Sequence, residues 1–168
     1  MIAIRNIKIS VRTSEVSLNN VLKHLSSENI PHRCYPNFVT FKKDFSFVVF
    51  KKSKNNSNHV NISSLRTNQD IKKSLHILKN LLKVKILSLK VDNVVATTNI
   101  KKRLNLLDIA RSKTLNTKYN PEQFPGVFVK LVKGTAILFH SGKVVIVGSK
   151  SYKDLKWVVK EITAGLKT

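Results

Sequence analysis

The feature that most constrains the fold of this chain is an internal repeat. Three pairs of matching residues are separated by 87 to 89 positions: Asn6 and Asn93, Tyr35 and Phe124, and Phe50 and Phe139. The residues around each pair follow similar patterns, as in RNIKISVRT and DNVVATTNI. Self-similarity at a fixed period predicts that one supersecondary unit occurs twice. We therefore expect a first repeat over residues 1–85 and a second over residues 86–168, which together form one domain.

Both halves predict the same order of elements: a strand, a helix, several antiparallel strands and a long helix. Alternation of apolar and polar residues predicts the strands, and apolar residues spaced three and four apart predict the helices. The helical segments are SLNNVLKHLSS, with Ser17 as N-cap, NQDIKKSLHILKNLLKV, NLLDIARSKTL and SYKDLKWVVKEITAGL. This order predicts an α+β fold in which one continuous antiparallel sheet has helices on one face and leaves the other face open.

The charge of the chain indicates an anionic partner. The 168 residues include 31 Lys and Arg against 9 Asp and Glu, a formal net charge of +22. Self-repulsion of this size disfavours compaction unless an anion screens it. Nucleic acid is the first candidate, because its dense phosphates reward dispersed cations by counterion release. A membrane surface and a basic surface kept for solubility are the alternatives.

Several classes of protein are excluded. The single cysteine, Cys34, rules out an intrachain disulfide framework, and the alternating N-terminus MIAIRNIKIS is typical of a strand rather than of a signal peptide. No apolar run has the length of a membrane span. The acids form no tight pair, and the chain has no phosphate-binding glycine loop or hydrolase motif. His32 and Cys34 are too few ligands for a metal site, so we expect no enzyme activity, no metal and no cofactor.

The open face of the second half is predicted to be apolar. Alternation places Asn93, Val95 and Thr97 on one face of the first strand, and Val145 and Val147 on one face of the last. An open face of this kind on a strongly basic protein suits a partner that is both anionic and apolar. The minor groove of DNA has phosphate walls and a floor of base edges, and it fits that description.

Four motifs of the second half occur in a distinctive order: Tyr-Asn-Pro-Glu, Phe-Pro-Gly, Phe-x-Ser-Gly-Lys and Gly-x-Lys-Ser. With these motifs, the chain from Asp92 onward resembles the repeat of the TATA-box-binding protein (TBP) family. The segment from Ile4 to Leu82 resembles it more weakly, through the Asn of NIKISV, the YP pair and FVVF. The resemblance implies a curved, saddle-shaped antiparallel sheet of two pseudo-symmetric repeats, with helices on the convex face.

The resemblance also implies a set of DNA-contacting residues. The aromatic wedges that insert between base pairs would be Tyr35, Phe50, Phe124 and Phe139. The residues that face base edges in the minor groove would be Asn6, Lys8, Asn61, Ser63, Asn93, Val95, Val145 and Val147. The phosphate-binding cations would be Arg66, Lys130, Lys143 and Lys150.

The resemblance further implies a function and its partners. The protein would be a transcription initiation factor that binds A/T-rich promoter DNA as a monomer and bends it. A basal factor similar to TFIIB and the RNA polymerase machinery would be its protein partners, and no membrane would be involved. The expected location is the nucleus, or a viral or cytoplasmic transcription compartment if the protein is viral.

The first repeat departs from the family pattern. Tyr35 stands where the family has Phe, and KKSKNNSNH, which we expect to form a longer loop, replaces the Ser-Gly-Lys turn. Lys8, Asn61 and Ser63 stand at positions that match three valines of the second repeat: Val95, Val145 and Val147. The family's preference for A·T steps rests partly on an apolar floor that would clash with the guanine amino group. We therefore expect a non-palindromic site, with the second repeat over the half that is more restricted to A·T.

Other interpretations of these residues stay open at the level of sequence. The rings of Phe124 and Phe139 could belong to the core, and the first-repeat wedges have other candidates in Phe38, Phe41, Phe45 and Phe47. Asn6 and Asn93 could cap strand ends. Phe128 and Leu138 are expected to pack against the helices. The whole protein could instead be a basic module that stacks single-stranded nucleic acid, or a TBP-like interaction protein that has lost DNA binding.

Overall fold

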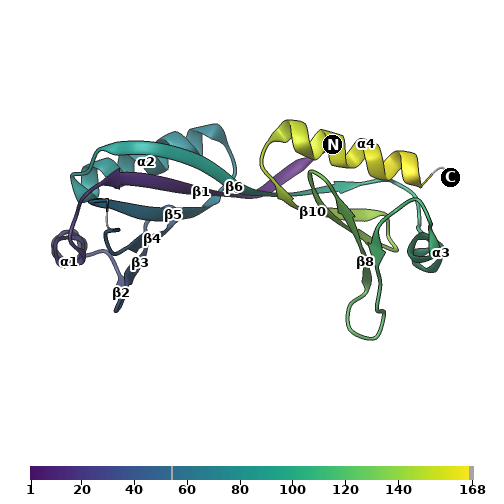
Figure 1. Cartoon of the computed structure of the whole chain (residues 1–168), viewed down its shortest axis with the longest axis horizontal. Helices are drawn as coiled ribbons and strands as arrows, with labels where there is room; N and C mark the ends of the chain where they lie inside the picture. Colours follow the sequence, from purple (N-terminus) through teal and green to yellow (C-terminus); the bar gives the residue numbers. More distant parts are fainter. Residues whose placement is uncertain (54, 167–168) are drawn as a thin grey trace. The chain divides into compact units, whose positions relative to one another are not determined.

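The computed structural model describes residues 1–53 and 55–166, which form two compact units (Figure 1). The N-terminal unit comprises residues 6–92. The C-terminal unit comprises residues 1–5 and the described chain from residue 93 onward. The predicted division into repeats 1–85 and 86–168 stays a prediction.

The N-terminal unit contains a run of strands with two helices. Its elements in chain order are β1 (Ala3–Ser14), α1 (Leu18–Ser27), β2 (His32–Tyr35), β3 (Phe38–Lys42), β4 (Ser46–Phe50), β5 (Ser57–Leu65) and α2 (Asn68–Leu82). The strands lie in the order β2-β3-β4-β5-β1. Ser17 caps α1 as predicted, because its side chain accepts a hydrogen bond from the backbone N–H of Asn20.

The C-terminal unit repeats this order of elements. After β6 (Ile86–Asn99) come α3 (Leu106–Arg111), β7 (Thr117–Lys118), β8 (Gly126–Leu131), β9 (Gly134–Phe139), β10 (Lys143–Ser149) and α4 (Tyr152–Gly165). The strands lie in the order β6-β10-β9-β8-β7, and the ten strands belong to one antiparallel sheet. With four helices in the described part of the chain, this arrangement confirms the predicted α+β class.

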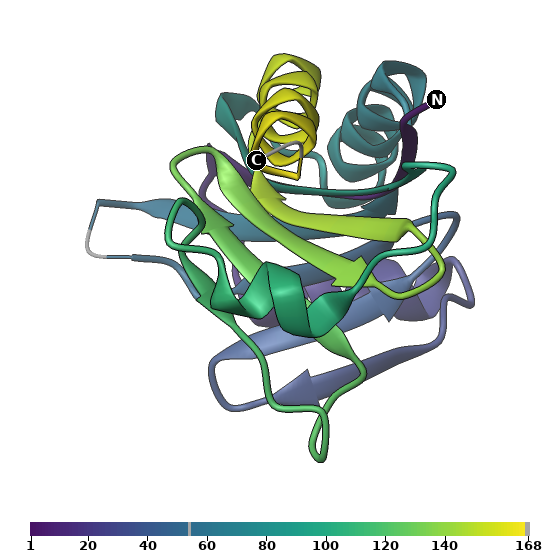
Figure 2. The ribbon, with the colours of Figure 1, turned by 90° about the vertical axis from the view of Figure 1, so that its right-hand side faces the viewer.

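Each unit buries one face of its strands beneath helices. In the C-terminal unit, α4 lies across β9 and β10 (Figure 2). The buried side chains of these strands are Ala136, Leu138, Val144 and Ile146, and those of α4 are Leu155, Val158 and Ile162. In the N-terminal unit, the buried side chains of the strands include Ile9, Val11, Val39, Phe47, Val49, Val60 and Ile62. The alternate residues of the same strands are half-buried or exposed, as period-2 alternation requires.

The segment KKSKNNSNH is shorter as a loop than the sequence predicted. Strand β5 begins at Ser57, so the last residues of the segment belong to the sheet, whereas Lys54 lies outside the described residues. Asn58 is fully buried. Its amide donates to the carbonyls of Val16 and Phe50, at 3.0 and 2.9 Å, and its oxygen accepts from the N–H of Val16 at 2.8 Å. This amide therefore joins the chain before α1 to the end of β4.

Replacing this buried amide should destabilise the fold strongly. Asn58→Ala leaves buried backbone groups of Val16 and Phe50 without partners, at about 1–3 kcal/mol for each such group. We expect the free energy of unfolding to fall by about 3–5 kcal/mol in urea titrations. Asn55→Ala, at an exposed position of the same segment, is the matched control and should change it by less than about 0.5 kcal/mol. Equal stabilities of the two variants would contradict this role of Asn58.

Candidate nucleic-acid interface

The open face of the C-terminal unit is apolar along a row of cross-strand partners. Phe128 of β8 pairs with Ile137 of β9, which pairs with Val145 of β10, which pairs with Thr97 of β6. We call such a row a rung. All four side chains are half-buried although no helix covers them. Val95 and Val147 lie on the same face, on alternate positions of β6 and β10.

Three phenylalanine rings form a cluster at the end of this face. The ring centroid of Phe124 lies 5.1 Å from that of Phe128 and 5.9 Å from that of Phe139. Phe124 is 37% exposed and the other two rings are half-buried. The prediction that Phe128 packs against the helices is wrong, because Val127 and Val129 take the buried positions of β8. Leu138 is 0% exposed, which confirms the prediction for that residue.

Gly126 allows this close approach of the rings. It is the cross-strand partner of Phe139. A Cβ atom at this position would lie 2.9 Å from the Cε1 atom of Phe124 and 3.0 Å from the Cγ2 atom of Ile137. Both distances are shorter than normal van der Waals contacts. The glycine of the Phe-Pro-Gly motif is therefore required by the packing of the rings rather than by a special backbone conformation.

The N-terminal unit has an aromatic cluster of its own. Tyr35, which is 40% exposed, stacks on Phe38 at 4.4 Å between centroids, and Phe38 lies 5.8 Å from Phe50. Phe38 pairs with Phe50 across β3 and β4, as Gly126 pairs with Phe139 in the other unit. Phe38 is one of the alternative wedge candidates that the sequence offered. The other three, Phe41, Phe45 and Phe47, are buried in the core.

Asn6 and Asn93 occupy equivalent positions in the two units. The Oδ1 atom of Asn6 accepts a hydrogen bond of 2.8 Å from the N–H of Ser64, and that of Asn93 accepts one of 2.7 Å from the N–H of Gly148. Ser64 and Gly148 both have positive φ angles, 71° and 84°. Because each Oδ1 is occupied, the NH₂ group of each amide is the donor that remains for a partner.

Polar residues replace the apolar ones on the open face of the N-terminal unit. Lys8 lies between the buried residues Ile7 and Ile9, so it points to the open side of β1. Asn61 and Ser63 of β5 are half-buried at the alternate positions of that strand. Their cross-strand partners on β4 are Val48 and Ser46. The structure therefore places all three sequence-predicted residues on the same face.

The predicted phosphate-binding cations are exposed at strand ends. Arg66 and Lys150 directly follow β5 and β10, and their backbone N–H groups donate to Asp70 and Asp154. The N–H of Arg66 lowers the pKa of Asp70, and the side chain of Ser151 lowers that of Asp154. The Asp70 carboxylate also completes the capping box of α2, whereas the Ser151 side chain caps α4. In both units the cation therefore directly precedes the cap of the following helix.

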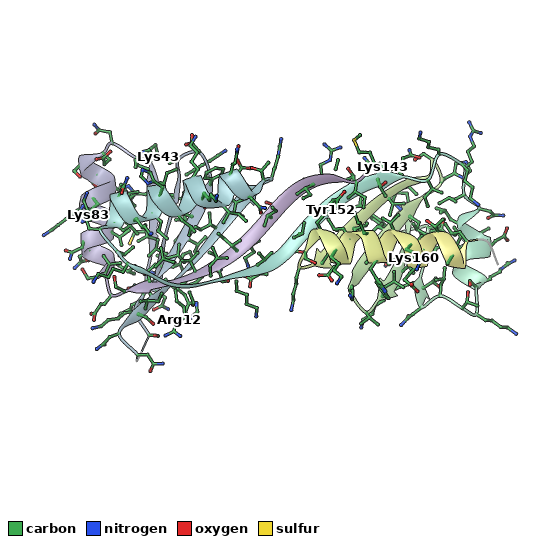
Figure 3. All side chains as sticks on the ribbon, turned by 90° about the horizontal axis from the view of Figure 1, so that it is seen from above. Arg12, Lys43, Lys83, Lys143, Tyr152 and Lys160 are labelled. Carbon is green, nitrogen blue, oxygen red and sulfur yellow. The ribbon has the colours of Figure 1, made fainter. Side chains whose placement is uncertain are left out.

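The remaining cations lie on strands near the rings. Lys143 begins β10 (Figure 3), and Lys130 of β8 pairs with Thr135. In the N-terminal unit, Lys42 of β3 pairs with Ser46 in the same way. Comparison of the two repeats in the sequence missed Lys42, because the segments around Lys42 and Lys130 share no motif. Their equivalence becomes visible only in the cross-strand pairing of the structure.

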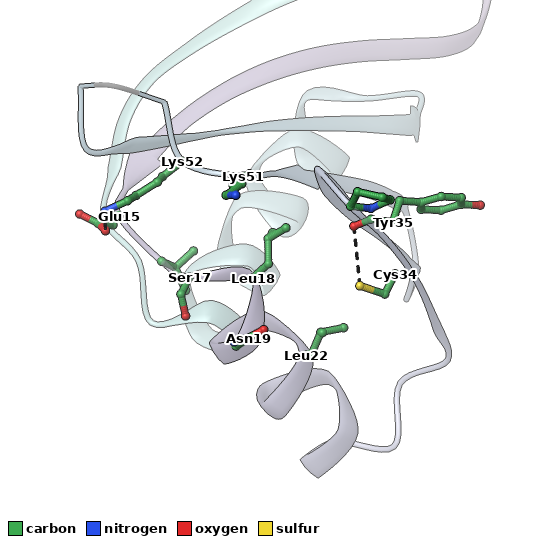
Figure 4. Close-up of a pocket in the computed structure, with 11 residues that line it drawn as sticks. Glu15, Ser17, Leu18, Asn19, Leu22, Cys34, Tyr35, Lys51 and Lys52 are labelled. Atoms are coloured by element: carbon green, nitrogen blue, oxygen red, sulfur yellow. Dashed lines mark hydrogen bonds and ion pairs between the residues drawn. The ribbon is translucent and has the colours of Figure 1, made fainter.

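A surface hollow lies in the N-terminal unit. A hollow of about 670 Å³ next to α1 is lined by Leu18, Leu22 and Cys34, and the ring of Tyr35 extends away from the two leucines (Figure 4). Two of its three charged lining residues, Glu15 and Lys52, form an ion pair of 2.5 Å. Among residues 1–53 and 55–166, no group of His, Cys, Asp or Glu could hold a metal ion, and no helix could cross a membrane.

Comparison with known proteins identifies relatives of both parts of the chain. Residues 88–168 match the family model for transcription factor TFIID, or TATA-binding protein. TATA-box-binding protein E of Halobacterium salinarum is 31% identical over 165 residues, which cover 90% of this chain and 85% of that protein. The solved structure of Methanococcus jannaschii TBP has a TM-score of 0.81 and 25% identity, covering 99% of this chain and 98% of that one.

The similarity is concentrated in the second half of the chain. The TATA-box-binding protein of Pyrodictium occultum is 47% identical, but over 79 residues only, or 46% of this chain and 39% of that protein. The chain therefore matches about two fifths of that relative's length. The N-terminal half is the more divergent one, in agreement with its polar open face.

Truncation of an open-face ring should cost less folding stability than truncation of a core side chain. Leu138→Ala removes a fully buried side chain and should lower the free energy of unfolding by about 2–5 kcal/mol. Phe124→Ala removes a ring that is 37% exposed, and we expect a loss below about 2 kcal/mol. Chemical denaturation of both variants provides the measurement. A larger loss for Phe124→Ala than for Leu138→Ala would place Phe124 in the core instead.

Proposed function

The chain belongs to the TATA-box-binding protein family, and on that premise we propose that it is a transcription initiation factor that binds the minor groove of promoter DNA. The observation that carries the proposal is the composition of the open faces. Each unit presents a cluster of three rings that no helix covers, together with exposed cations at the ends of the neighbouring strands. Apolar rings next to cations suit duplex DNA, in which stacked base pairs lie between anionic phosphate backbones.

Membership in this family of transcription factors confirms that the protein is not an enzyme. Its proposed action is binding and deformation of DNA. Bending by insertion of apolar side chains in the minor groove is a mechanism for which TATA-box-binding proteins are themselves the standard example. The contribution of each group of side chains follows from its chemistry.

The two asparagines would contact the floor of the groove. Both A·T and T·A present only acceptors there, the adenine N3 and thymine O2 atoms. The NH₂ groups of Asn6 and Asn93 are donors that the protein leaves available, because each Oδ1 already accepts a backbone N–H. Donors that meet acceptors fit either orientation of an A·T pair, so these two residues would favour A·T without fixing its direction.

The rings would open base steps at the ends of the site. Phe124 and Phe139 in the C-terminal unit, with Tyr35, Phe38 and Phe50 in the N-terminal unit, provide flat apolar surfaces. Inserting such a surface between base pairs compensates part of the lost base stacking and kinks the duplex. Flexible pyrimidine–purine steps are the least costly to open, so they would be favoured at the insertion points.

The exposed cations would bind phosphates beside the rings. The proposed set comprises Lys42, Arg66, Lys130, Lys143 and Lys150. These contacts position the protein without reading sequence, and they make affinity depend on salt.

The proposed partners and location follow from the family. A basal factor similar to TFIIB and RNA polymerase are the protein partners that we propose, with a monomer of this chain on DNA. Halobacterium salinarum and Pyrodictium occultum are archaea, which have no nucleus, so these relatives give no support to a nuclear location. We propose the intracellular compartment in which promoter DNA is transcribed.

Duplex binding should depend steeply on salt. If six to ten phosphates are neutralised, the logarithm of the association constant should fall with the logarithm of salt concentration at a slope of about −5 to −9. Fluorescence anisotropy of a labelled A/T-rich duplex between low and moderate salt measures this slope. Single-stranded competitor of the same sequence tests the alternative of base stacking on exposed rings such as Tyr35. A competitor that displaces the duplex completely at equal concentration would support that alternative, and loss of binding to both would indicate a lost DNA function.

Truncation of an inserted ring should reduce DNA bending while the protein stays folded. We expect Phe139→Ala and Phe38→Ala each to lower the end-to-end energy transfer of a doubly labelled duplex in the complex, since the opened step loses its apolar support. The control is Val132→Ala, a change at an exposed position that should leave bending unaltered. Unchanged bending in Phe38→Ala would show that this ring is not a wedge.

A further inference from the structure

One rung of the N-terminal unit is polar where its counterpart is apolar. In the C-terminal unit the rung consists of Phe128, Ile137, Val145 and Thr97. In the N-terminal unit, the rung at the same place consists of Thr40, Val48, Asn61 and Ser10. The hydroxyl group of Thr97 accepts a hydrogen bond of 2.8 Å from the Nε atom of Arg5. The hydroxyl group of Ser10 instead contacts the carboxylate of Asp92. An acid therefore takes the place of a base.

The cluster of Ser10, Asn61 and Asp92 has more hydrogen-bond acceptors than donors to fill them. The Oγ atom of Ser10 lies within hydrogen-bonding distance of the Asp92 Oδ2 atom and, at 3.0 Å, of the Asn61 Oδ1 atom. A serine hydroxyl has a single hydrogen, so it donates to one of them at a time. The hydrogen of Ser10 leaves the other oxygen unfilled, so that oxygen can accept from an external donor.

The floor of the minor groove offers one kind of donor. A·T and T·A pairs present acceptors only, whereas a G·C pair adds the 2-amino group of guanine. An oxygen of the cluster that faced an A·T pair would lose its water and meet another acceptor, which is unfavourable. Against guanine, the same oxygen would accept a hydrogen bond. Lys8 and Arg12 flank Ser10 on the same face of β1 and offset the repulsion between the Asp92 carboxylate and the phosphates.

We propose that Ser10, Asn61 and Asp92 form a reader of the guanine 2-amino group, so that the N-terminal unit selects a G·C pair within the promoter site. The proposal rests on the minor-groove binding proposed above and names the base that this part of the face recognises. The C-terminal unit, with Val145 and Thr97 at the same place, has no acceptor cluster and selects A·T. The preferred site is therefore asymmetric, with guanine confined to one half.

Site selection followed by removal of a single amino group tests this reader. Duplexes bound by the full chain are first selected from a random pool, and the selected sequence is synthesised with each guanine replaced in turn by inosine. Inosine pairs with cytosine but lacks the 2-amino group, so only the minor-groove donor is lost. We expect one replacement to weaken binding about tenfold, the effect of one good base contact. An easier deformation of the inosine duplex would change affinity in the opposite direction.

Three variants assign the effect to the cluster. Asn61→Val installs the residue of the C-terminal rung, and Asp92→Ala removes the carboxylate. Each should reduce the guanine-to-inosine affinity ratio, and the two together should bring it close to one. Asp108→Ala is the matched control, because it removes an exposed carboxylate from α3, away from the cluster, and changes the net charge as Asp92→Ala does. Thermal melting of each variant confirms that it is folded before binding is measured.

The outcomes separate this reader from the proposed function. Equal affinities for guanine and inosine duplexes, or a selected site without guanine, would overturn the reader while leaving DNA binding intact. An unchanged ratio in both Asn61→Val and Asp92→Ala would also overturn it. Failure to bind any duplex would overturn the minor-groove function, and the reader with it.

Discussion

In each unit, a residue with a positive φ angle donates its backbone N–H to an asparagine side chain, and this hydrogen bond determines the geometry of the open face. Ser64 donates to Asn6 in one unit and Gly148 donates to Asn93 in the other. The bond joins the last strand of each unit to its first strand and leaves the NH₂ group of the amide as the remaining donor. Two residues after each donor, Arg66 or Lys150 begins the capping interaction of the following helix. Ser64 keeps this conformation at a steric cost of about 1–2 kcal/mol that glycine avoids.

The two units combine this common backbone arrangement with different side chains. The rung of Val145 and Thr97 carries a base, Arg5, and the rung of Asn61 and Ser10 carries an acid, Asp92. A backbone that accepts both sets shows that the helices and the buried face determine the fold, whereas the open face is free to vary. Substitutions on that face change what the protein can contact at little cost in folding stability, because the side chains concerned are half-buried.

The sequence predicted the elements of the fold better than the details of the face. The periodicity identified the helices and the order of elements along the chain, because burial of one face imposes that pattern. It misplaced Phe128, since VFV in β8 is apolar at every position and alternation cannot decide which residues are buried. It left Phe38 as one wedge candidate among several and missed Lys42, because their equivalence to Gly126 and Lys130 appears only in cross-strand pairing. It also missed the contact between Ser10 and Asp92, which are 82 positions apart.

The rings and the rungs would determine different properties of a DNA site. In the free protein each ring already contacts a neighbour, with centroids 4.4 to 5.9 Å apart, so part of its apolar surface is covered. Inserting a ring into DNA exchanges ring–ring contact for ring–base contact, and the net gain is small. The energy needed to open the base step then decides where insertion occurs, and that energy depends on stacking and flexibility. Base identity between the proposed insertion points would depend instead on donors and acceptors along the rungs. Under the proposed reader, changes in Asn61 or Asp92 would therefore alter which bases are preferred without moving the kinks.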